Sequence, residues 1–525
     1  MSPPKRDAGP PLTLGTAGHI DHGKTALVNV LTGKDTDRLP EERSRGISIE
    51  LGYAPLELPS GRRLSVVDVP GHERFVRTMV AGASGVDMFL LCVAADDGVM
   101  PQTREHMTVL RQLGVTDGVV AITKSDLGDA ELAAEEAKEL VPGAPVVQVS
   151  TLSGTGLDDL RAALDRVASG LPGRSGEDGP VRLHVDRSFT LRGIGTVVTG
   201  TLWSGVVRAG DSVRVLPRGL DARVRSVQIH DQPVELAEAG QRVALNLAGV
   251  GWRELGRGDL VTTPDAEVRP RYLLDARAEL EPSASSLRRG ARIHVHHGTR
   301  EAPARVVPLE ADELRPGTPA LVQLRLEAPL VAAPDDRLIL RQVAPPDTIG
   351  GGRVVDAAPR KHGARPDVVE RLLAIERGEP VDAPAAASAA EPASPASRPE
   401  VEELDDAALR LAALLRSDGA APRADADLAG AAGLEMRAAE ERLRRLERSG
   451  QAVRVGRNLH FHPEPLAALE ARVVAICERD GRATIAGVRD ELGGSRKVAQ
   501  AVLEHLDRTK VTRREGDAHV LRRRR

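Results

Sequence analysis

The spacing of apolar and polar positions changes several times along the chain, and each change predicts a different kind of structure. Between residues 11 and 172, short apolar runs such as LSVVDVP, MFLLCVAAD and GVVAITKSD alternate with helical stretches such as TREHMTVLRQLG. Buried strands that alternate with helices are typical of a parallel α/β sheet. We therefore predict an α/β domain over residues 11–172, preceded by a disordered segment at 1–10.

Beyond this domain the pattern is that of β-structure. Residues 175–266 and 268–358 contain β-branched runs separated by Gly, Asp and Pro, among them GTVVTGTLWSG, ARVRSVQIH and ALVQLRLEA. Short strands with regular turn signals are typical of barrels. We expect two β-barrel domains in succession.

The C-terminal part repeats one design after a linker. Residues 359–378 read as a remnant helix, and 379–403 are so rich in Ala, Pro, Ser and Glu that they cannot form a core. Residues 404–464 and 465–525 each contain an amphipathic helix, two further helices and a hairpin. That order predicts two winged helices.

Composition limits the partners and the compartment. The 525 residues carry a net charge of −4, so a surface that binds nucleic acid must be local. Cys92 and Cys477 suggest no disulfide framework, and Cys92 reads as a small buried residue. No signal peptide or membrane span is apparent. We expect a cytoplasmic protein with no membrane partner, and a monomer by default.

The strongest chemical signal is GHIDHGKT at residues 18–25. It fits the phosphate-binding loop pattern G-x-x-x-x-G-K-[ST] between a strand and a helix. Backbone N–H groups and the helix dipole attract phosphate, the lysine reaches the β- and γ-phosphates, and the threonine hydroxyl ligates Mg²⁺. The predicted nucleotide contacts here are Gly18, His19, Asp21, His22, Gly23, Lys24 and Thr25.

Two further motifs follow in the order expected of a GTPase, and they indicate that the bound nucleotide is GTP. In DVPGHE, Asp68 is placed to hold Mg²⁺, Gly71 to donate to the γ-phosphate, and His72 to orient the attacking water. In TKSD, the Asp126 carboxylate can accept both guanine protons, which adenine does not offer. The other predicted contacts are Thr123, Lys124 and Ser150, and Ser48 is the candidate switch hydroxyl on Mg²⁺.

Together these residues resemble a known family. GHIDHGKT, DVPGHE and RGISIELGY resemble the translational GTPases related to elongation factor Tu. TKSD, VDRSFTLRGIGTVVTGTLWSG and SRKVAQAVLEHLDRTKVTRR resemble the selenocysteine-specific elongation factors. The resemblance implies a P-loop GTPase domain, two β-barrels that bind aminoacyl-tRNA with them, and winged helices that bind an mRNA hairpin. Members commonly carry four winged helices, whereas this chain has two complete ones, and threonine usually stands where Ser48 does.

The resemblance also assigns a cargo pocket in the second domain. The matching positions are Asp186, Arg187 and Arg242. A selenol is more acidic than a thiol, so selenocysteine is an anion at neutral pH, and two guanidinium groups can select it over neutral serine. Barrel-rim surface charge is the alternative reading of the same residues.

Basic residues gather in the last winged helix. Ser495 is a good N-cap for a helix that opens on basic side chains. Arginine suits hairpin RNA because it contacts phosphates and stacks on bases. The predicted RNA contacts are Ser495, Arg496, Lys497, Arg508, Lys510, Arg513 and Arg514. For His294 and His296 in IHVHHG we expect barrel surface and not a metal site.

The motifs predict a GTPase with GTP and Mg²⁺ as cofactors, and the resemblance implies that it delivers selenocysteyl-tRNA to the ribosomal A site at recoded UGA codons with ribosome-stimulated hydrolysis. Two alternatives stay open. A general aminoacyl-tRNA carrier or initiation-type GTPase would lack winged helices. A GTP-switched regulator would bind duplex DNA through its winged helices, but the tandem barrels would then have no obvious task.

Overall fold

The chain folds into two compact units, residues 1–392 and 393–525. The computed structural model describes residues 9–36, 48, 50–72, 75–174, 179–191, 193–344, 347–381, 405–419, 422–448, 451–456, 458–492, 495–509, 511–516 and 518–521. Within these ranges, no helix combines the length and the apolar character that crossing a bilayer requires.

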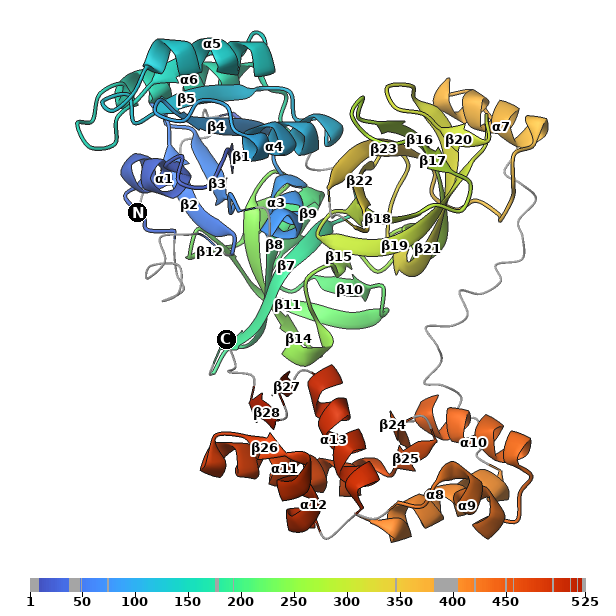
Figure 1. Cartoon of the computed structure of the whole chain (residues 1–525). Helices are drawn as coiled ribbons and strands as arrows, with labels where there is room; N and C mark the ends of the chain where they lie inside the picture. The colour runs from blue at the N-terminus through green and yellow to red at the C-terminus, as the bar shows by residue number, and fades with distance from the viewer. Residues whose placement is uncertain are drawn as a thin grey trace. The chain divides into compact units, whose positions relative to one another are not determined.

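The first part of unit 1 is the α/β domain that the sequence predicts. Its sheet has the order β2-β3-β1-β4-β5-β6, with β2 antiparallel to β3 and the other neighbours parallel. Helices α1 and α6 cover one face, and α3, α4 and α5 cover the other (Figure 1). The strands are β1 (Leu12–Ala17), β2 (Gly52–Glu57), β3 (Arg63–Asp68), β4 (Met88–Ala94), β5 (Gly118–Thr123) and β6 (Val146–Gln148). The helices are α1 (Lys24–Thr32), α3 (Val76–Ala83), α4 (Pro101–Gln112), α5 (Ala130–Leu140) and α6 (Leu157–Gly170).

The carboxyl ends of the parallel strands place the predicted nucleotide motifs together. β4 and β5 are buried along their whole length, which agrees with the nearly continuous apolar runs from which they were predicted. The loops after β1, β3 and β5 carry GHIDHGKT, DVPGHE and TKSD. Because parallel strands end on the same edge of the sheet, these three loops meet there. Cys92, in the middle of β4, is buried as expected.

The first barrel follows directly. Its strands close in the order β10-β15-β7-β8-β14-β11, and β11 pairs back with β10. The six strands are β7 (Arg182–Leu191), β8 (Gly195–Ser204), β10 (Ser212–Leu216), β11 (Leu220–Ile229), β14 (Arg242–Ala248) and β15 (Leu260–Thr262). Strand β12 (Gln232–Val234) pairs with the end of β11, while β9 (Val206–Arg208) and β13 (Leu236–Glu238) form a separate two-stranded sheet, and a short 3-10 helix η2 (Trp252–Glu254) follows β14. Its core consists mainly of Val and Leu, which fits the low aromatic content.

The second barrel is closed as well, with the strand order β16-β21-β19-β18-β22-β23. Its strands are β16 (Arg271–Leu280), β18 (Arg292–His297), β19 (Arg300–Pro308), β21 (Ala320–Leu330), β22 (Arg337–Gln342) and β23 (Thr348–Asp356), with β17 (Leu287–Arg288) and β20 (Glu313–Leu314) as a small separate pair. The fold class predicted for this half of the chain is thereby confirmed.

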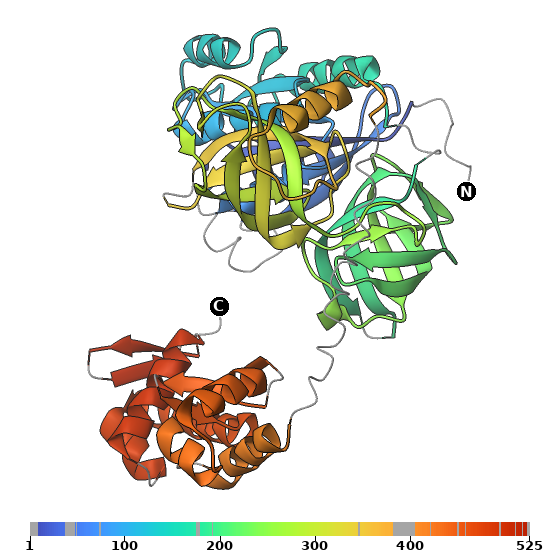
Figure 2. The same cartoon turned by 90° about the vertical axis from the view of Figure 1, so that its right-hand side faces the viewer.

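The predicted remnant helix is α7 (Pro366–Glu376), and it packs on the outside of the second barrel (Figures 1 and 2). A buried polar network fastens the segment before it. His362 Nε2 lies 2.8 Å from Asp275 Oδ2, and Gln323 Nε2 donates to Asp275 Oδ1 and to the Arg360 carbonyl. The segment between barrel and helix is therefore part of the globular body.

The second barrel also contacts the α/β domain. Glu105 Oε1 of α4 accepts a hydrogen bond from Thr348 Oγ1 at 3.2 Å. Gln112 Nε2 of the same helix donates to Glu281 Oε1 at 2.8 Å. His294 and His296 belong to this buried region, where both approach Glu301, which pairs with Arg77 of α3. His296 is only 5% exposed, so the expectation of barrel surface is wrong for it. Among the described residues, no three or more His, Cys, Asp or Glu side chains gather in a way that could hold a metal ion.

Unit 2 contains the two predicted winged helices. The first has α8 (Asp406–Asp418), α9 (Asp425–Ala431), α10 (Met436–Arg448), β24 (Val453–Gly456) and β25 (Leu459–Phe461). The second has α11 (Pro463–Asp480), β26 (Ala483–Thr484), α12 (Ile485–Leu492), α13 (Arg496–Arg508), β27 (Thr512–Glu515) and β28 (Ala518–Leu521). The hairpin of the first shares a hydrophobic core with the helices of the second, so the two modules form one body.

Candidate functional site: a phosphate-binding loop and an arginine cluster

The phosphate-binding loop runs from β1 into α1. Gly23 is the N-cap of α1 and has a left-handed φ of 74°, which glycine adopts without strain. Lys24 is buried, and its Nζ donates to the carbonyls of Gly18 (3.0 Å) and His19 (2.5 Å). Burial lowers the pKa of this ammonium group. The loop borders a cavity of about 430 Å³ that Ser48, Gly71 and His72 also line.

Oxygen ligands suited to Mg²⁺ gather at the helix side of this cavity. Thr25 Oγ1 lies 2.9 Å from Ser48 Oγ and donates to Asp68 Oδ2 at 2.8 Å. Asp68 is buried and also accepts from the hydroxyls of Thr16 and Thr36, both at 2.9 Å. Burial raises the pKa of Asp68, and the three hydroxyl donors oppose that rise. An all-oxygen set of two hydroxyls and a carboxylate fits a hard divalent cation.

The second motif reaches the same cavity. Gly71 lies so close to the loop that a Cβ there would come within 2.3 Å of Lys24 Nζ and 2.9 Å of Ile20 N, which explains why glycine is needed. His72 lines the cavity with its ring 5.9 Å from that of Phe75. The backbone at Gly71 is therefore close enough to the phosphate-binding loop to contact a phosphate bound there.

TKSD, the motif predicted to recognise guanine, lies next to the phosphate-binding loop. Thr123 Oγ1 donates to the His22 carbonyl at 2.8 Å, which ties TKSD to the phosphate loop. Lys124 has a φ of 52° and pairs with Asp96 at 2.9 Å. Asp126 is exposed at the turn, and Ser150 is buried, with its Oγ accepting from Ser153 N at 3.3 Å.

Two residues of α4 also hold the loop, and the sequence reasoning missed them. His106 Nδ1 accepts from Gly18 N at 3.1 Å, and Gln102 Oε1 accepts from Ile20 N at 3.3 Å. Burial lowers the pKa of His106 to about 3 and that of His22 to about 4, so both imidazoles are neutral and can accept hydrogen bonds. The spacing of Gln102 and His106 in PQTREHM places both on one helix face, and this was the available signal.

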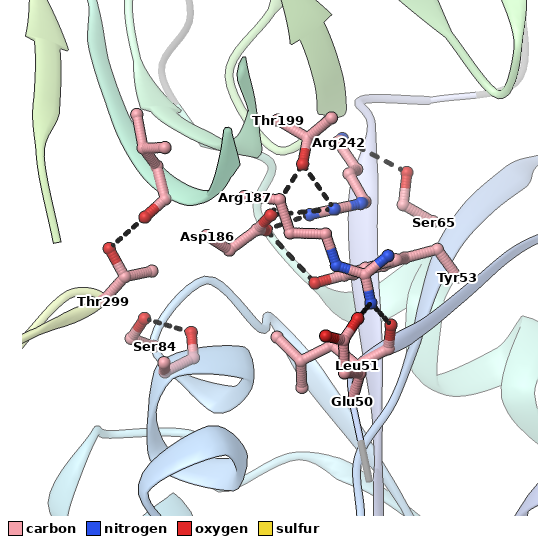
Figure 3. A network of polar contacts seen from close by, with 12 residues as sticks. Glu50, Leu51, Tyr53, Ser65, Ser84, Asp186, Arg187, Thr199, Arg242 and Thr299 are labelled. Atoms are coloured by element: carbon pink, nitrogen blue, oxygen red, sulfur yellow. Dashed lines mark hydrogen bonds and ion pairs between the residues drawn. The ribbon is translucent and has the colours of Figure 1, made fainter. Parts of the chain in front are cut away.

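The predicted cargo residues also come together, but not as an open pocket. Arg242 forms a two-pronged ion pair with Asp186, and the two side chains are only 11% and 6% exposed. Thr199 Oγ1 and Tyr53 Oη donate to the same carboxylate at 2.7 and 3.2 Å (Figure 3). The Arg242 guanidinium lies on the Tyr53 ring, 3.0 Å from its centroid. The positive charge of Arg242 is therefore neutralised within the protein by Asp186.

Arg187 is the more accessible of the two arginines. Its Nη2 lies 2.9 Å from the Glu50 carboxylate and donates to the Leu51 carbonyl at 2.6 Å, while a quarter of its side chain stays exposed (Figure 3). Arg187 and Arg242 both border a cavity of about 300 Å³ between β2 and β3 and the first barrel. Glu50, Leu51 and Tyr53 were not predicted to take part, although RGISIELGY contains all three.

In the last winged helix, the predicted RNA contacts differ in their surroundings. Ser495 Oγ caps α13 by accepting from Val498 N at 3.2 Å, and Arg496 and Lys497 are exposed on its first turn. Arg513 pairs with Glu515 at 2.5 Å, and Arg514 Nε donates to the Gly516 carbonyl. Lys510 lies outside the described residues.

Arg508 is engaged inside unit 2. Its Nη2 reaches the carbonyls of Arg454 and Val455 in β24, at 3.4 and 3.2 Å, and His505 Nδ1 at 3.1 Å. The side chain therefore joins the two winged helices.

Comparison with known proteins now gives the family. Sequence-family models match at residues 10–169 (elongation factor Tu GTP binding domain), 195–262 (elongation factor Tu domain 2), 275–361 (selenocysteine-specific elongation factor, beta-barrel domain) and 475–521 (elongation factor SelB, winged helix). The selenocysteine-specific elongation factor of Methanocaldococcus jannaschii is 31% identical over 375 residues, covering 66% of this chain and 80% of that one. The chain belongs to the family of selenocysteine-specific elongation factors.

Bacterial members of this family are similar too. Those of Desulfomicrobium baculatum and Escherichia coli are 44% and 39% identical over 361 and 379 residues, covering 67% and 70% of this chain. The matched regions span only 56% and 59% of those two relatives.

Solved structures agree with the family. The crystal structure of a bacterial selenocysteine-specific elongation factor matches with a TM-score of 0.63 at 25% identity, covering 98% of this chain and all of that chain. The SelB factor of Methanococcus maripaludis, solved with the GTP analogue GPPNHP, matches with a TM-score of 0.60 at 27% identity, over 67% and 80% of the two chains. The predicted combination of a GTPase domain, two barrels and winged helices is the architecture of this family.

Proposed function

We propose that this member of the family is a GTPase that carries selenocysteyl-tRNA to the ribosomal A site at recoded UGA codons. It acts in the cytoplasm, as a monomer, and binds the selenoprotein mRNA hairpin through its last winged helix. The observation that carries the proposal is the arginine cluster of the first barrel, which touches the segment that connects it to the phosphate-binding loop.

The nucleotide is bound by groups already near one another. Lys24 and the N–H groups of the loop neutralise the β- and γ-phosphates, and Asp126 selects guanine, with Thr123, Lys124 and Ser150 around the base. Thr25, Ser48 and Asp68 would hold Mg²⁺, which supplies positive charge to the phosphates when bound. His72 lines the same cavity and orients the water that attacks the γ-phosphate.

Cargo choice rests on charge. Selenocysteine is an anion at neutral pH, whereas serine is neutral, so a guanidinium separates two cargoes that differ little in size. Arg187 is the residue in a position to meet the anion, because Asp186 already neutralises Arg242. Asp186 and Arg242 then position β7, which carries Arg187.

Protection of the aminoacyl ester tests the proposal. The protein with GTP is mixed with selenocysteyl-tRNA, or with seryl-tRNA of the same tRNA body, and spontaneous deacylation is followed. We expect strong protection of the selenocysteyl ester alone, and loss of that preference in Arg187→Ala. Arg223→Ala removes an exposed arginine of the same barrel outside the cavity and serves as the control. Equal protection of both esters would refute the pocket. Protection of neither, with tight binding to duplex DNA, would favour the regulator.

A further inference from the structure

One short segment touches both the nucleotide site and the arginine cluster. Ser48 Oγ lies 2.9 Å from Thr25 Oγ1 at the proposed Mg²⁺ site. Two residues later, the Glu50 carboxylate pairs with Arg187, and the Leu51 carbonyl accepts from the same guanidinium nitrogen. The ring of Tyr53, at the start of β2, packs against the Arg242 guanidinium. Ser48 therefore contacts the first site, while Glu50, Leu51 and Tyr53, a few positions further along the sequence, contact the second site, where Figure 3 shows them.

The two ion pairs of the cluster differ in how easily they open. Asp186 and Arg242 are nearly buried, so separating them would leave a charge without a partner in a dry environment. The Glu50 and Arg187 side chains are 54% and 25% exposed, so water solvates both when they separate. Glu50 is thus the one carboxylate of the drawn network that can leave its arginine at small cost (Figure 3).

We propose that Glu50 is an internal competitor for the cargo anion. It holds Arg187 until the selenolate of selenocysteyl-tRNA displaces it, one singly charged anion for another. Neutral serine offers Arg187 nothing that could replace the carboxylate. Glu50 is two positions from Ser48, so the proposed competitor lies close in sequence to a residue of the proposed Mg²⁺ site. The inference rests on the proposed function and adds a residue of the GTPase domain to the control of cargo affinity.

The test is the variant Glu50→Gln, which keeps the shape of the side chain and removes its charge. Affinities for selenocysteyl-tRNA and seryl-tRNA are measured with the full chain bound to a non-hydrolysable GTP analogue. We expect binding of selenocysteyl-tRNA to tighten by up to about fivefold, the range of a solvent-exposed ion pair, and binding of seryl-tRNA to stay unchanged. Glu57→Gln is the matched control, because Glu57 at the end of β2 pairs with Arg63 of the neighbouring strand β3 at 3.7 Å, outside the cluster cavity.

A double-mutant cycle identifies the partner. In the Arg187→Ala background, Glu50→Gln should have no further effect on selenocysteyl-tRNA, because the competitor has nothing left to compete for. Unchanged selenocysteyl-tRNA affinity in Glu50→Gln, or an equal change for both cargoes, would overturn the inference while leaving the proposed function in place. If the unmodified protein does not prefer selenocysteyl-tRNA over seryl-tRNA, the proposed function itself fails.

Discussion

At the level of single residues, the nucleotide site and the arginine cluster use charge in opposite ways. Asp126 is an exposed carboxylate, and we propose that it accepts hydrogen bonds from the ligand. Asp186 is a buried carboxylate whose donors come from the protein itself, namely Arg242, Thr199 and Tyr53. Substitution of the first should therefore change ligand choice, and substitution around the second should change stability.

The variant Asp126→Asn should exchange guanine for xanthine. Asparagine cannot accept both guanine protons, and the loss of charge-assisted hydrogen bonds should weaken GTP binding by roughly 100-fold. Xanthine carries a carbonyl in place of the guanine amino group, so the asparagine amide can donate to it and XTP binding should strengthen. Competition with a fluorescent nucleotide measures both affinities. Glu131→Gln, on the exposed first turn of α5, should bind like the unmodified protein.

The variant Arg242→Ala should destabilise unit 1. It leaves the buried Asp186 carboxylate without its cation, which typically costs about 3–5 kcal/mol when a buried pair is broken. Urea unfolding followed by fluorescence of Trp203 and Trp252, both in the first barrel, reports on the same domain. Arg365→Ala, which breaks an exposed pair with Asp367, should cost less than about 1 kcal/mol. Equal costs for the two variants would contradict this account.

At the level of elements, the first winged helix is held by a histidine between two carboxylates. His460 of β25 places Nδ1 2.8 Å from Asp425 of α9, and Nε2 2.8 Å from Glu447 of α10. Burial lowers the pKa of His460, but the two carboxylates outweigh it and the net shift is upward. When it is protonated, the imidazole can donate to both carboxylates and so ties three elements together.

The stability of this module should consequently fall as the pH rises. The histidine pKa is higher in the folded than in the unfolded state, where it is about 6.5, so its contribution is complete below that pH and is lost as the pH rises through the folded-state value. Hydrogen exchange of α9 and β25, corrected for intrinsic rates, should show faster opening at pH 8 than at pH 6. His460→Gln should abolish this dependence. A persisting slope in that variant would assign it to other groups.

At the level of the whole molecule, the contacts proposed for tRNA and those proposed for the hairpin lie in different compact units. Arg187 belongs to the first unit, while Arg496 and Lys497 belong to the second. With a net charge of −4 for the chain, affinity for RNA must come from such local groups. The two kinds of RNA binding should therefore be separable by mutation.

The double variant Arg496→Ala/Lys497→Ala should weaken hairpin binding and reduce its salt dependence. Each lost phosphate contact lowers the slope of log affinity against log salt by about one. Protection of the selenocysteyl ester should stay unchanged, because unit 1 is untouched. Arg437→Ala/Arg444→Ala, at exposed positions on α10 of the first winged helix, is the matched control. Equal weakening in both double variants would indicate that RNA binding is not confined to the last module.

The sequence alone determined the order and class of the domains and the nucleotide motifs. It could do so because these depend on local spacing: nearly continuous apolar runs for the buried strands β4 and β5, and fixed intervals for GHIDHGKT, DVPGHE and TKSD. The parallel sheet then brings the three motifs to one edge without further information. The domain order and the nucleotide motifs were therefore predictable from the amino-acid sequence alone.

Only the tertiary structure decided which charges neutralise one another. Arg242 and Arg187 look equivalent in the sequence, yet one is buried against Asp186 and the other meets Glu50 at a partly exposed edge. Likewise, His296 and Arg508 read as surface groups but serve contacts between barrel and GTPase domain and between winged helices. An ion pair depends on distance and burial across segments far apart in the chain, and neither quantity is contained in the local pattern of residues.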